Sequence, residues 1–226
     1  IMNLDKLLVV VTGPTASGKT ALSIQLASLF GSEILSADSR QVYKGMDIGT
    51  GKVLRDRVES RKYQVASIRR RGYFYKGVRH HLMDVASPKR TFAVVQYKKL
   101  AERVMRDILR RGRLPIICGG TGLYIDALVN DWKLPEVEPN LKLRMELEKK
   151  SAEELFLELK KLDPRRAGDI DRFNKRRLVR ALEIVMETGK PIETLRRAQG
   201  KNSSYEFLKI GIKVTPAELK KRIKKR

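Results

Sequence analysis

Residues 13–20 read GPTASGKT and match the phosphate-binding loop pattern G-x-x-x-x-G-K-[ST]. Gly13 and Gly18 permit a tight turn whose successive backbone N–H groups point inward, and a helix that starts after the loop adds its positive dipole end. The Lys19 ammonium can reach a terminal phosphate, and the Thr20 hydroxyl suits a magnesium ion that also contacts phosphate. The loop therefore predicts a phosphate-binding site.

The sequence around this loop favours a true phosphate site over a chance match. The apolar stretch LLVVVT before the loop is typical of a buried strand, and TALSIQLASLF after it is typical of an amphipathic helix. Kinases, ATPases, helicases and transferases all use such a loop, so the motif, which is shared with ATP-binding proteins, leaves the reaction open.

Strand and helix patterns alternate through the first 130 residues. We expect strands over 7–12, 33–38, 80–85 and 114–118, and helices over 19–30, over 92–111 and after the glycine turn at 119–121. Thr91 is the expected cap of the long helix, and Gly112 its stop. This order predicts a parallel α/β sheet, in which ligands bind beyond the carboxyl ends of the strands. Gly13–Thr20, Asp38 and Gly119–Thr121 are expected to converge there.

A second type of pattern runs from 131 to 200, where strand signals stop. Helical patterns cover 140–162, 164–170, 174–188 and 191–199. The apolar residues of 174–188 form one face, which leaves Lys175, Arg176 and Arg180 elsewhere on that helix. These cations either contact nucleic acid or form an ordinary solvated face. We therefore expect an all-helical insertion over 131–200 in a P-loop NTPase-like core.

The strand pattern returns in the last segment, 201–226, which we expect to rejoin the core formed by 1–130. Alternating residues predict a strand over 205–215, and Thr215, Pro216 and Glu218 supply the cap, first-turn proline and capping-box acid of a new helix. Because the sequence ends inside this helix, we expect it to be part of a longer protein.

Charge is the most unusual feature of the composition. The chain has 49 Lys and Arg against 26 Asp and Glu, a formal net charge of +23, which indicates a polyanionic partner larger than a nucleotide. Within 53–79, nine basic and two acidic residues alternate with four aromatic ones, a mixture that suits RNA. A solvated loop is the alternative for this segment.

The composition also excludes several classes. One cysteine and two histidines rule out an internal disulfide and an ordinary zinc site. Cys118 lies in the apolar run LPIIC, so we expect a buried core thiol and not a nucleophile. No apolar run approaches 18 residues, and no basic and apolar leader precedes the first strand, so we expect a cytoplasmic protein without membrane contact.

Five motifs together resemble the bacterial tRNA dimethylallyltransferase, or isopentenyl transferase, family. They are GPTASGKT, SADSRQVYKGMDIGTGK, HHLMDV, LPIICGGTGLYIDAL and NKRRLVRALEI. The resemblance covers nearly the whole chain in the right order, and only the loop motif is shared with unrelated NTPases. It implies transfer of a five-carbon prenyl group from dimethylallyl diphosphate to the exocyclic amine of the adenosine beside the anticodon of tRNA, with release of diphosphate.

The resemblance also implies a role for individual residues. The donor diphosphate would be held by Gly13, Thr15, Ala16, Ser17, Gly18, Lys19 and Thr20, with Mg²⁺ at Thr20. Asp38 would orient or deprotonate the amine, or else serve only as a helix cap or as a partner of the magnesium site. Arg222 would bind diphosphate and act with Asp38 and Thr20 in catalysis. The expected contacts with the tRNA anticodon stem-loop are Asp38, Ser39, Arg40, Gln41, Thr121, Lys142, Arg176 and Arg180.

Two departures from the family and two rival functions stay open at this point. Residues 53–79 are longer and more basic than the family's usual connection, and its C-terminal helices do not follow residue 226. One rival is an adenylate prenyltransferase or small-molecule P-loop kinase. The other is an RNA-binding NTPase, which is disfavoured because no separate Walker-B aspartate is evident unless Asp38 or Asp84 serves. We expect a monomer.

Overall fold

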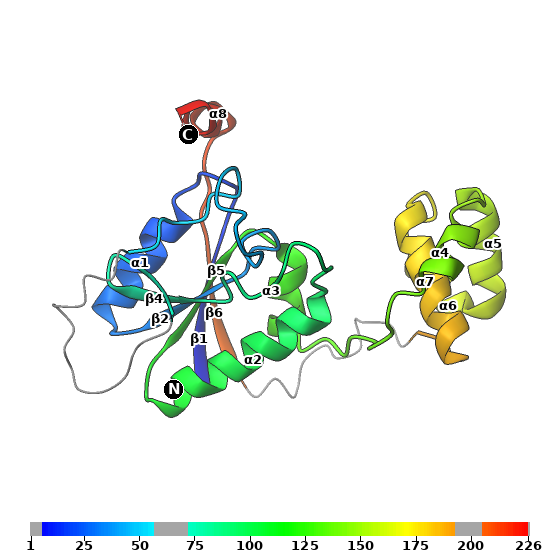
Figure 1. Cartoon of the computed structure of the whole chain (residues 1–226), viewed down its shortest axis with the longest axis horizontal. Helices are drawn as coiled ribbons and strands as arrows, with labels where there is room; N and C mark the ends of the chain where they lie inside the picture. Colours follow the sequence, from blue (N-terminus) through cyan, green and yellow to red (C-terminus); the bar gives the residue numbers. More distant parts are fainter. Residues whose placement is uncertain (1–5, 57–71, 193–204, 226) are drawn as a thin grey trace. The chain divides into compact units, whose positions relative to one another are not determined.

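The computed structural model describes residues 6–56, 72–192 and 205–225 (Figure 1). The chain divides into two compact units, one formed by 1–131 with 200–226 and the other by 132–199. These bounds lie close to those of the predicted core, returning segment and insertion. Most of the helix predicted over 191–199 and most of the basic segment, including Arg69, Arg70 and Arg71, lie outside the described residues.

The first unit is built on one sheet of six strands in the order β3-β4-β2-β5-β1-β6. Every neighbouring pair is parallel except β3 and β4, which run antiparallel. The sheet confirms the predicted α/β class. The strands are β1 (Leu7–Thr12), β2 (Glu33–Ser36), β3 (Tyr73–Tyr75), β4 (Val78–His81), β5 (Pro115–Gly119) and β6 (Glu206–Gly211).

Helices cover both faces of this sheet because successive side chains of a strand point to opposite faces. Val9 and Val11 of β1 pack with α1 (Lys19–Leu29) in one core cluster. Leu8 and Val10 pack with α2 (Val94–Arg110) and α3 (Gly122–Val129) in another (Figure 1). The buried residues of α2 are Tyr97, Ala101, Met105 and Ile108, whose spacing of three or four residues places them on one face of the helix.

The second unit is entirely helical in its described part. Its helices are α4 (Leu141–Leu147), α5 (Ala152–Leu162), α6 (Pro164–Asp169) and α7 (Lys175–Thr188). An apolar core joins them, and the fully buried Glu183 of α7 accepts hydrogen bonds from Arg144 and Arg180 and from the backbone N–H of Asn140. This carboxylate therefore ties α4 and the segment before it to α7.

The helix predicted over 140–162 is two helices. Ser151 begins α5 with a capping box, in which its Oγ accepts from the N–H of Glu154 and the Glu154 carboxylate accepts from the N–H of Ser151. This local arrangement satisfies two otherwise unpaired N–H groups and starts a new helix. The break between the two helices was not predicted from the sequence, because the helical spacing of apolar residues is similar on both sides of it.

The strand predicted over 80–85 is also wrong in its bounds. β4 spans Val78–His81, and Leu82 and Asp84 then take positive φ angles of 63° and 56°, which end the strand. β4 pairs with β3 in a hairpin that we did not predict. Its turn residues Lys76 and Gly77 both have positive φ, as a two-residue type I′ turn requires.

Three smaller differences affect element ends. The second strand ends at Ser36 and the last strand spans only Glu206–Gly211. α2 begins at Val94, where the Gln96 side chain accepts from the N–H of Ala93, so Thr91 is not its cap. None of the described helices is both long enough and apolar enough to cross a membrane.

Candidate active site

The phosphate-binding loop joins β1 to the N-terminus of α1. Gly13 has φ 155°, and a Cβ at this position would lie 2.9 Å from the carbonyl oxygen of Ile212, just beyond β6. Gly18, with φ 100°, is the residue before the first turn of α1. Both positions need glycine for conformation, and Gly13 needs it for space as well, so backbone N–H groups can approach an anion closely.

Two side chains of the loop also carry groups that suit an anion. The Lys19 ammonium donates to the carbonyl oxygen of Pro14 at 2.7 Å, so its side chain folds over the loop. The Ser17 hydroxyl is buried and has no hydrogen-bond partner among the described residues. A buried hydroxyl and an ammonium within one glycine loop are suited to phosphate oxygens.

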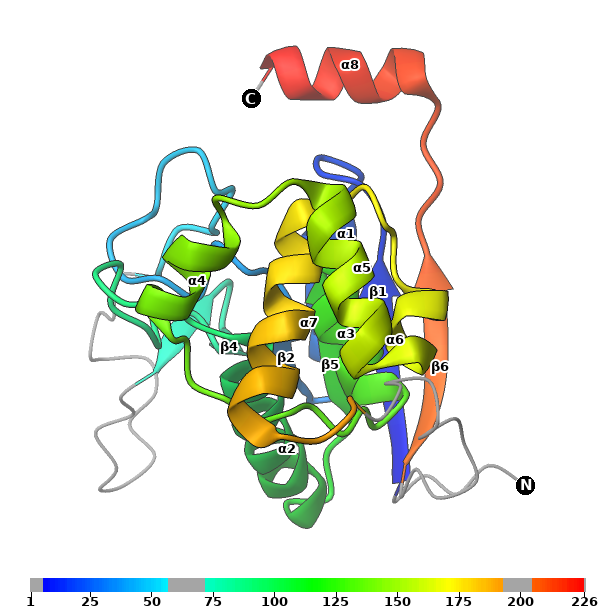
Figure 2. The same cartoon turned by 90° about the vertical axis from the view of Figure 1, so that its right-hand side faces the viewer.

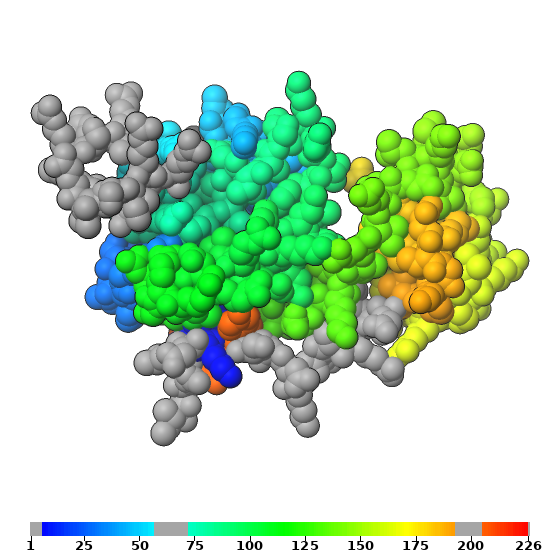
Figure 3. Space-filling model, turned by 60° about the horizontal axis from the view of Figure 1, so that its bottom comes forward, coloured from blue at the N-terminus to red at the C-terminus, as the bar shows by residue number. Residues whose placement is uncertain are grey.

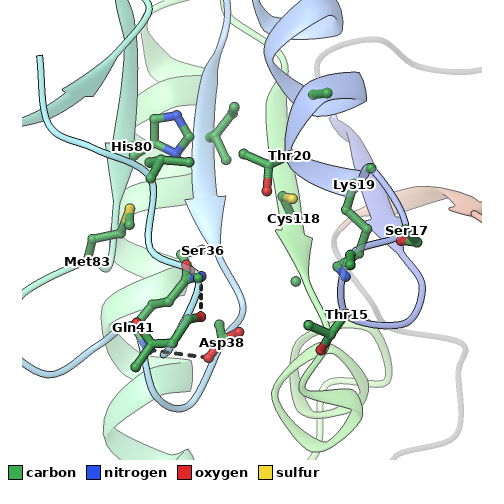
Figure 4. Close-up of a pocket in the computed structure, with 18 residues that line it drawn as sticks. Thr15, Ser17, Lys19, Thr20, Ser36, Asp38, Gln41, His80, Met83 and Cys118 are labelled. Atoms are coloured by element: carbon green, nitrogen blue, oxygen red, sulfur yellow. Dashed lines mark hydrogen bonds between the residues drawn. The ribbon is translucent and has the colours of Figure 1, made fainter. Parts of the chain in front are cut away.

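Asp38 follows β2 and lies across from this loop (Figure 4). Its Oδ1 accepts from the N–H groups of Arg40 at 2.9 Å and Gln41 at 3.3 Å, which holds the carboxylate in a tight turn. The Gln41 amide accepts from the Ser36 hydroxyl at 3.2 Å and donates to the Thr50 carbonyl at 3.3 Å. The predicted approach of Asp38 to the loop is therefore observed.

The second glycine turn reaches the same place. A Cβ on Gly119 would come within 2.1 Å of the Ala37 carbonyl oxygen. The end of β5 and the residue after β2 therefore approach so closely that only glycine fits at position 119. Thr121 Oγ1 accepts from the N–H of Ser39 at 2.9 Å. Two predicted tRNA contacts, Ser39 and Thr121, are thus brought together beside Asp38.

A cavity of about 300 Å³ joins these segments. The phosphate loop forms one side of it, and Ser36, Asp38 and Gln41 lie on the other (Figure 4). Its lining residues are Thr15–Ala21, Ile34, Ser36, Asp38, Gln41, Thr50, Gly51, Val53, His80, Met83, Cys118 and Gly119. The cavity therefore has a polar side, formed in part by the glycine loop, and an apolar portion contributed by Ile34, Val53 and Met83.

His80 is a lining residue that sequence reasoning missed. Its side chain is buried, and burial together with the neighbouring His81 lowers its pKa to about 4, so the imidazole is neutral at neutral pH. Its Nε2 has no hydrogen-bond partner among the described residues. The motif HHLMDV carries no local signal that separates this buried histidine from its neighbour.

Cys118 lies in the same wall and is buried, as predicted. Burial raises the pKa of its thiol, so the group stays protonated and is a poor nucleophile. Its contact with the cavity was not predicted, because an apolar run such as LPIIC does not reveal which residue ends at the pocket.

Lys52 anchors the remaining wall. Its buried ammonium contacts Asp84 at 2.7 Å, Asp47 at 2.8 Å and the Tyr43 carbonyl at 2.9 Å. Burial opposes the charge, but the hydrogen bonds to the two carboxylates outweigh it and raise the pKa of Lys52. Lys52 thus holds in place the segment that carries the lining residues Thr50 and Val53. Asp84 pairs with Lys52 and does not line the cavity.

Helix α8 (Pro216–Lys225) follows β6 at the carboxyl end of the sheet (Figures 1 and 2). Arg222 donates through Nη1 to the Ser17 carbonyl oxygen at 3.4 Å and through Nε to Glu218 at 2.8 Å. The structure therefore brings the arginine named from the resemblance to the phosphate loop, 205 residues earlier in the chain.

The remaining predicted RNA contacts lie in the second unit or on the surface. Arg40, Lys142 and Arg176 are exposed. The Arg180 guanidinium pairs with Glu183 and donates to the Val137 carbonyl at 3.0 Å, so it also holds its own unit together. Contact of these four residues with RNA stays a prediction.

Comparison with known families decides the assignment. A family model described as IPP transferase matches residues 41–226, and one described as isopentenyl transferase matches residues 6–72. The chain belongs to the IPP transferase family. The resemblance inferred from the five motifs is confirmed.

Known IPP transferases resemble this chain over nearly its full length. The tRNA dimethylallyltransferase of Geobacillus thermodenitrificans is 42% identical over 223 residues, covering 97% of this chain and 65% of the relative. A crystal structure of the tRNA isopentenylpyrophosphate transferase of Bacillus halodurans matches 98% of this chain and 64% of its own, with 36% identity and a TM-score of 0.57. A eukaryotic dimethylallyltransferase acting on tRNA matches 97% of this chain and 52% of its own, with 27% identity and a TM-score of 0.73.

The chain spans about 65% of the length of the first three curated relatives that it matches. It contains the phosphate loop, the Asp38 turn, the second glycine turn and Arg222, and these four features lie around or against one cavity.

Proposed function

We propose that the protein transfers a dimethylallyl group from dimethylallyl diphosphate to the exocyclic amine of the adenosine beside the anticodon of tRNA. One observation carries the proposal: a phosphate loop and the Asp38 carboxylate line the same cavity. Relatives named tRNA dimethylallyltransferase support it. Such a transfer needs an anion cradle for the leaving group and a base for the incoming amine, and this cavity offers both.

The diphosphate side of the reaction belongs to the loop. Its N–H groups, the start of α1, Lys19 and Arg222 supply positive charge where the leaving oxygen becomes more negative. Because these groups are positioned by the backbone, little reorganisation is needed as the carbon–oxygen bond breaks. The apolar lining of Ile34, Val53 and Met83 is suited to the five-carbon group.

The residues present also fit a magnesium ion. The described residues contain no cluster of three or more His, Cys, Asp or Glu that could hold a metal. The Thr20 hydroxyl and the Asp38 carboxylate do line the cavity, and Mg²⁺ is commonly held by few protein oxygens together with substrate phosphates. When bound, the ion would neutralise charge on the leaving diphosphate.

The acceptor side of the reaction belongs to Asp38. As the amine nitrogen bonds to the first carbon of the prenyl group and the carbon–oxygen bond to diphosphate breaks, the nitrogen must lose a proton. The Asp38 carboxylate would orient the amine and accept that proton. The adenine must leave its stack to enter a cavity, which is consistent with RNA contacts by Gln41 in the lining and by Ser39 and Thr121, which are joined next to Asp38.

We also propose that the protein acts as a monomer in the cytoplasm, with Lys142, Arg176 and Arg180 of the second unit assisting in tRNA binding. The net charge of +23 supports a polyanionic substrate over a mononucleotide.

The decisive experiment supplies labelled dimethylallyl diphosphate and magnesium with one of three acceptors or cosubstrates: unmodified tRNA, AMP or ATP. We expect label in a single adenosine of tRNA, identified by nucleoside mass spectrometry. Transfer to AMP and not to tRNA would instead assign an adenylate prenyltransferase. RNA-stimulated ATP turnover without prenyl transfer would assign an NTPase.

A further inference from the structure

Helix α2 carries a line of cations on its solvent side. Five basic residues recur at intervals of three or four, which places them on one stripe of the helix, and all are exposed. They are Lys99, Arg103, Arg106, Arg110 and, just past the helix, Arg113. We call them the α2 stripe. Figure 3 shows the face of the molecule on which α2 lies, in green.

In the part of the chain that the structure describes, the carboxylates of α2 do not pair with the stripe arginines Arg103, Arg106 and Arg110. The two acidic residues of α2, Glu102 and Asp107, pair with cations outside the stripe, Lys98 at 3.1 Å and Arg111 at 2.9 Å. Arg106 and Arg110 use their Nε atoms to donate to backbone carbonyls one turn earlier, at 3.3 and 3.4 Å. These bonds direct the two side chains along the helix and leave the charge of both guanidiniums at the surface.

The stripe continues into a second basic cluster at the start of β2. The buried Glu33 carboxylate is bound by Arg111 and contacted by Arg113 at 2.9 Å and His81 at 2.6 Å, with Arg79 at 4.0 Å. Burial opposes the Glu33 charge, but hydrogen bonds from His81 and Arg111 outweigh it and hold its pKa far below the usual range. One carboxylate thus faces three guanidiniums, which leaves the cluster positive.

The stripe is separate from the cavity. None of its residues lines the cavity, which is located at the carboxyl ends of the strands. α2 runs towards the opposite edge, because β5 begins there at Pro115, five residues after α2 ends. Arg110 and Arg113 therefore lie near the amino ends of the strands, and the role of the stripe is not explained by binding of the prenyl donor.

We propose that the α2 stripe binds the phosphate backbone of RNA, as a second contact surface for the acceptor of the proposed reaction. From Lys99 to Arg110 the helix rises by about 17 Å, so the stripe presents an extended row of cations, one for roughly each turn. A nucleic-acid backbone is the matching extended row of anions, and arginine binds phosphate with two parallel hydrogen bonds. The choice of tRNA as the RNA rests on the proposed function, whereas the binding of a phosphate backbone rests on the charges of the stripe alone.

The test compares two triple variants of the whole chain that each remove three positive charges. The first replaces Arg103, Arg106 and Arg110 with Gln, and the matched control replaces the exposed Lys160, Lys161 and Arg165 of the second unit with Gln. Gln and Arg have similar helix propensity, so α2 should persist. Binding of an unmodified anticodon stem-loop RNA is measured as a function of salt concentration.

Removing one cation that neutralises a phosphate flattens the dependence of log K on log salt by about 0.7 to 0.9, so the stripe variant should show a slope smaller by about 2 to 3. The control variant should keep most of the wild-type slope. A third variant with Lys at Arg103, Arg106 and Arg110 keeps the charge and should restore the slope, which guards against misfolding of the Gln variant. An equal loss in stripe and control variants, or an unchanged slope, overturns the proposal.

Prenyl transfer is assayed separately, so that the two ideas fail separately. If wild-type protein transfers the prenyl group and the stripe variant binds RNA with unchanged slope, the stripe proposal alone is wrong. If wild-type protein shows no transfer but the stripe variant loses RNA binding, the proposed function is wrong and the stripe stands. Binding of an acidic polypeptide in preference to RNA would overturn the assignment of the stripe to phosphate.

Discussion

Thr121 and Ser39 lie 82 residues apart in the chain, yet the Thr121 hydroxyl accepts from the backbone N–H of Ser39 at 2.9 Å. This bond joins the glycine turn after β5 to the turn after β2. Since Ser39 directly follows Asp38, the bond fixes the segment that carries the carboxylate. Thr121 therefore has a positioning role on geometric grounds, in addition to any contact with RNA.

Replacing Thr121 with Val removes this bond while keeping the side-chain shape. A hydrogen bond of this kind contributes about 1 kcal/mol, which corresponds to roughly a fivefold change in rate if it is lost in the transition state. We expect kcat for prenyl transfer to fall by about that factor, with little change in KM for the donor. Thr121→Ser keeps the hydroxyl and should behave as wild type. A Val variant in which only RNA affinity falls would contradict the positioning role.

Asp38→Asn tests the proposed base. Asn retains an oxygen that can accept from the N–H groups of Arg40 and Gln41, so the turn should persist while the proton acceptor is lost. We expect single-turnover transfer to fall by roughly 10² to 10⁴. Affinity for dimethylallyl diphosphate, measured by competition binding, should hardly change. Near-normal transfer by this variant would remove Asp38 from the chemistry.

Substitutions of Lys19 and Thr20 should have different effects, the first on binding of the prenyl donor and the second on the magnesium requirement. Lys19→Ala removes the ammonium beside the loop and should weaken binding of dimethylallyl diphosphate. Thr20→Ala removes the hydroxyl and should raise the magnesium concentration that supports half-maximal turnover. Both effects are measured by titrating one component at saturating levels of the other. Tight ATP binding without affinity for dimethylallyl diphosphate would contradict the donor assignment.

The features predicted correctly from the sequence are those whose signal is local. The strand, glycine loop and helix around Lys19 follow one another within 23 residues, and each has its own pattern of apolar residues or glycines. The parallel order then brought Asp38 to the same edge of the sheet. The role of Arg222 at the loop was predicted only from the family resemblance. No local pattern in so basic a helix distinguishes one cation from the next.

The features that were missed depend on contacts between distant segments. The pairing of Lys52 with Asp84 spans 32 residues, and the burial of His80 depends on the strands beside it. The β3–β4 hairpin had a local signal, with Lys76-Gly77 between two short alternating segments. Because of the many charges in 53–79, we instead interpreted this segment as an RNA contact or a solvated loop. Its turn conformation was not predicted because Lys seldom adopts positive φ.

Lys52→Met should destabilise the protein and disturb the cavity. The substitution leaves Asp84 and Asp47 close together without the buried ammonium between them. Breaking a fully buried ion pair costs about 3 to 5 kcal/mol, but both carboxylates here are partly exposed, so we expect about 2 kcal/mol in the free energy of unfolding. Chemical denaturation measures this loss. The exposed Lys44→Met is a matched control and should change stability little; equal losses in the two variants would contradict the anchoring role of Lys52.

The buried His80 predicts how stability depends on pH. Its pKa falls from an ordinary value of 6.5 to about 4 in the folded protein, so between these values the unfolded chain binds a proton that the folded chain does not. Stability from this group is therefore complete above pH 6.5 and declines as pH falls towards 4, by up to about 1.4 kcal/mol per pH unit. Glu33, whose pKa is also lowered, loses its contribution only below its ordinary value of 4.5.

Comparing the wild type with His80→Gln isolates this effect, because every other titrating group is shared. The unfolding free energies of the two proteins, measured by chemical denaturation, should differ by a constant amount above pH 6.5. Between pH 6.5 and 4 the wild type should lose stability more steeply than the variant. Parallel curves through this interval would show that His80 is protonated in the folded protein near its ordinary pKa, and therefore that water or another group solvates its Nε2.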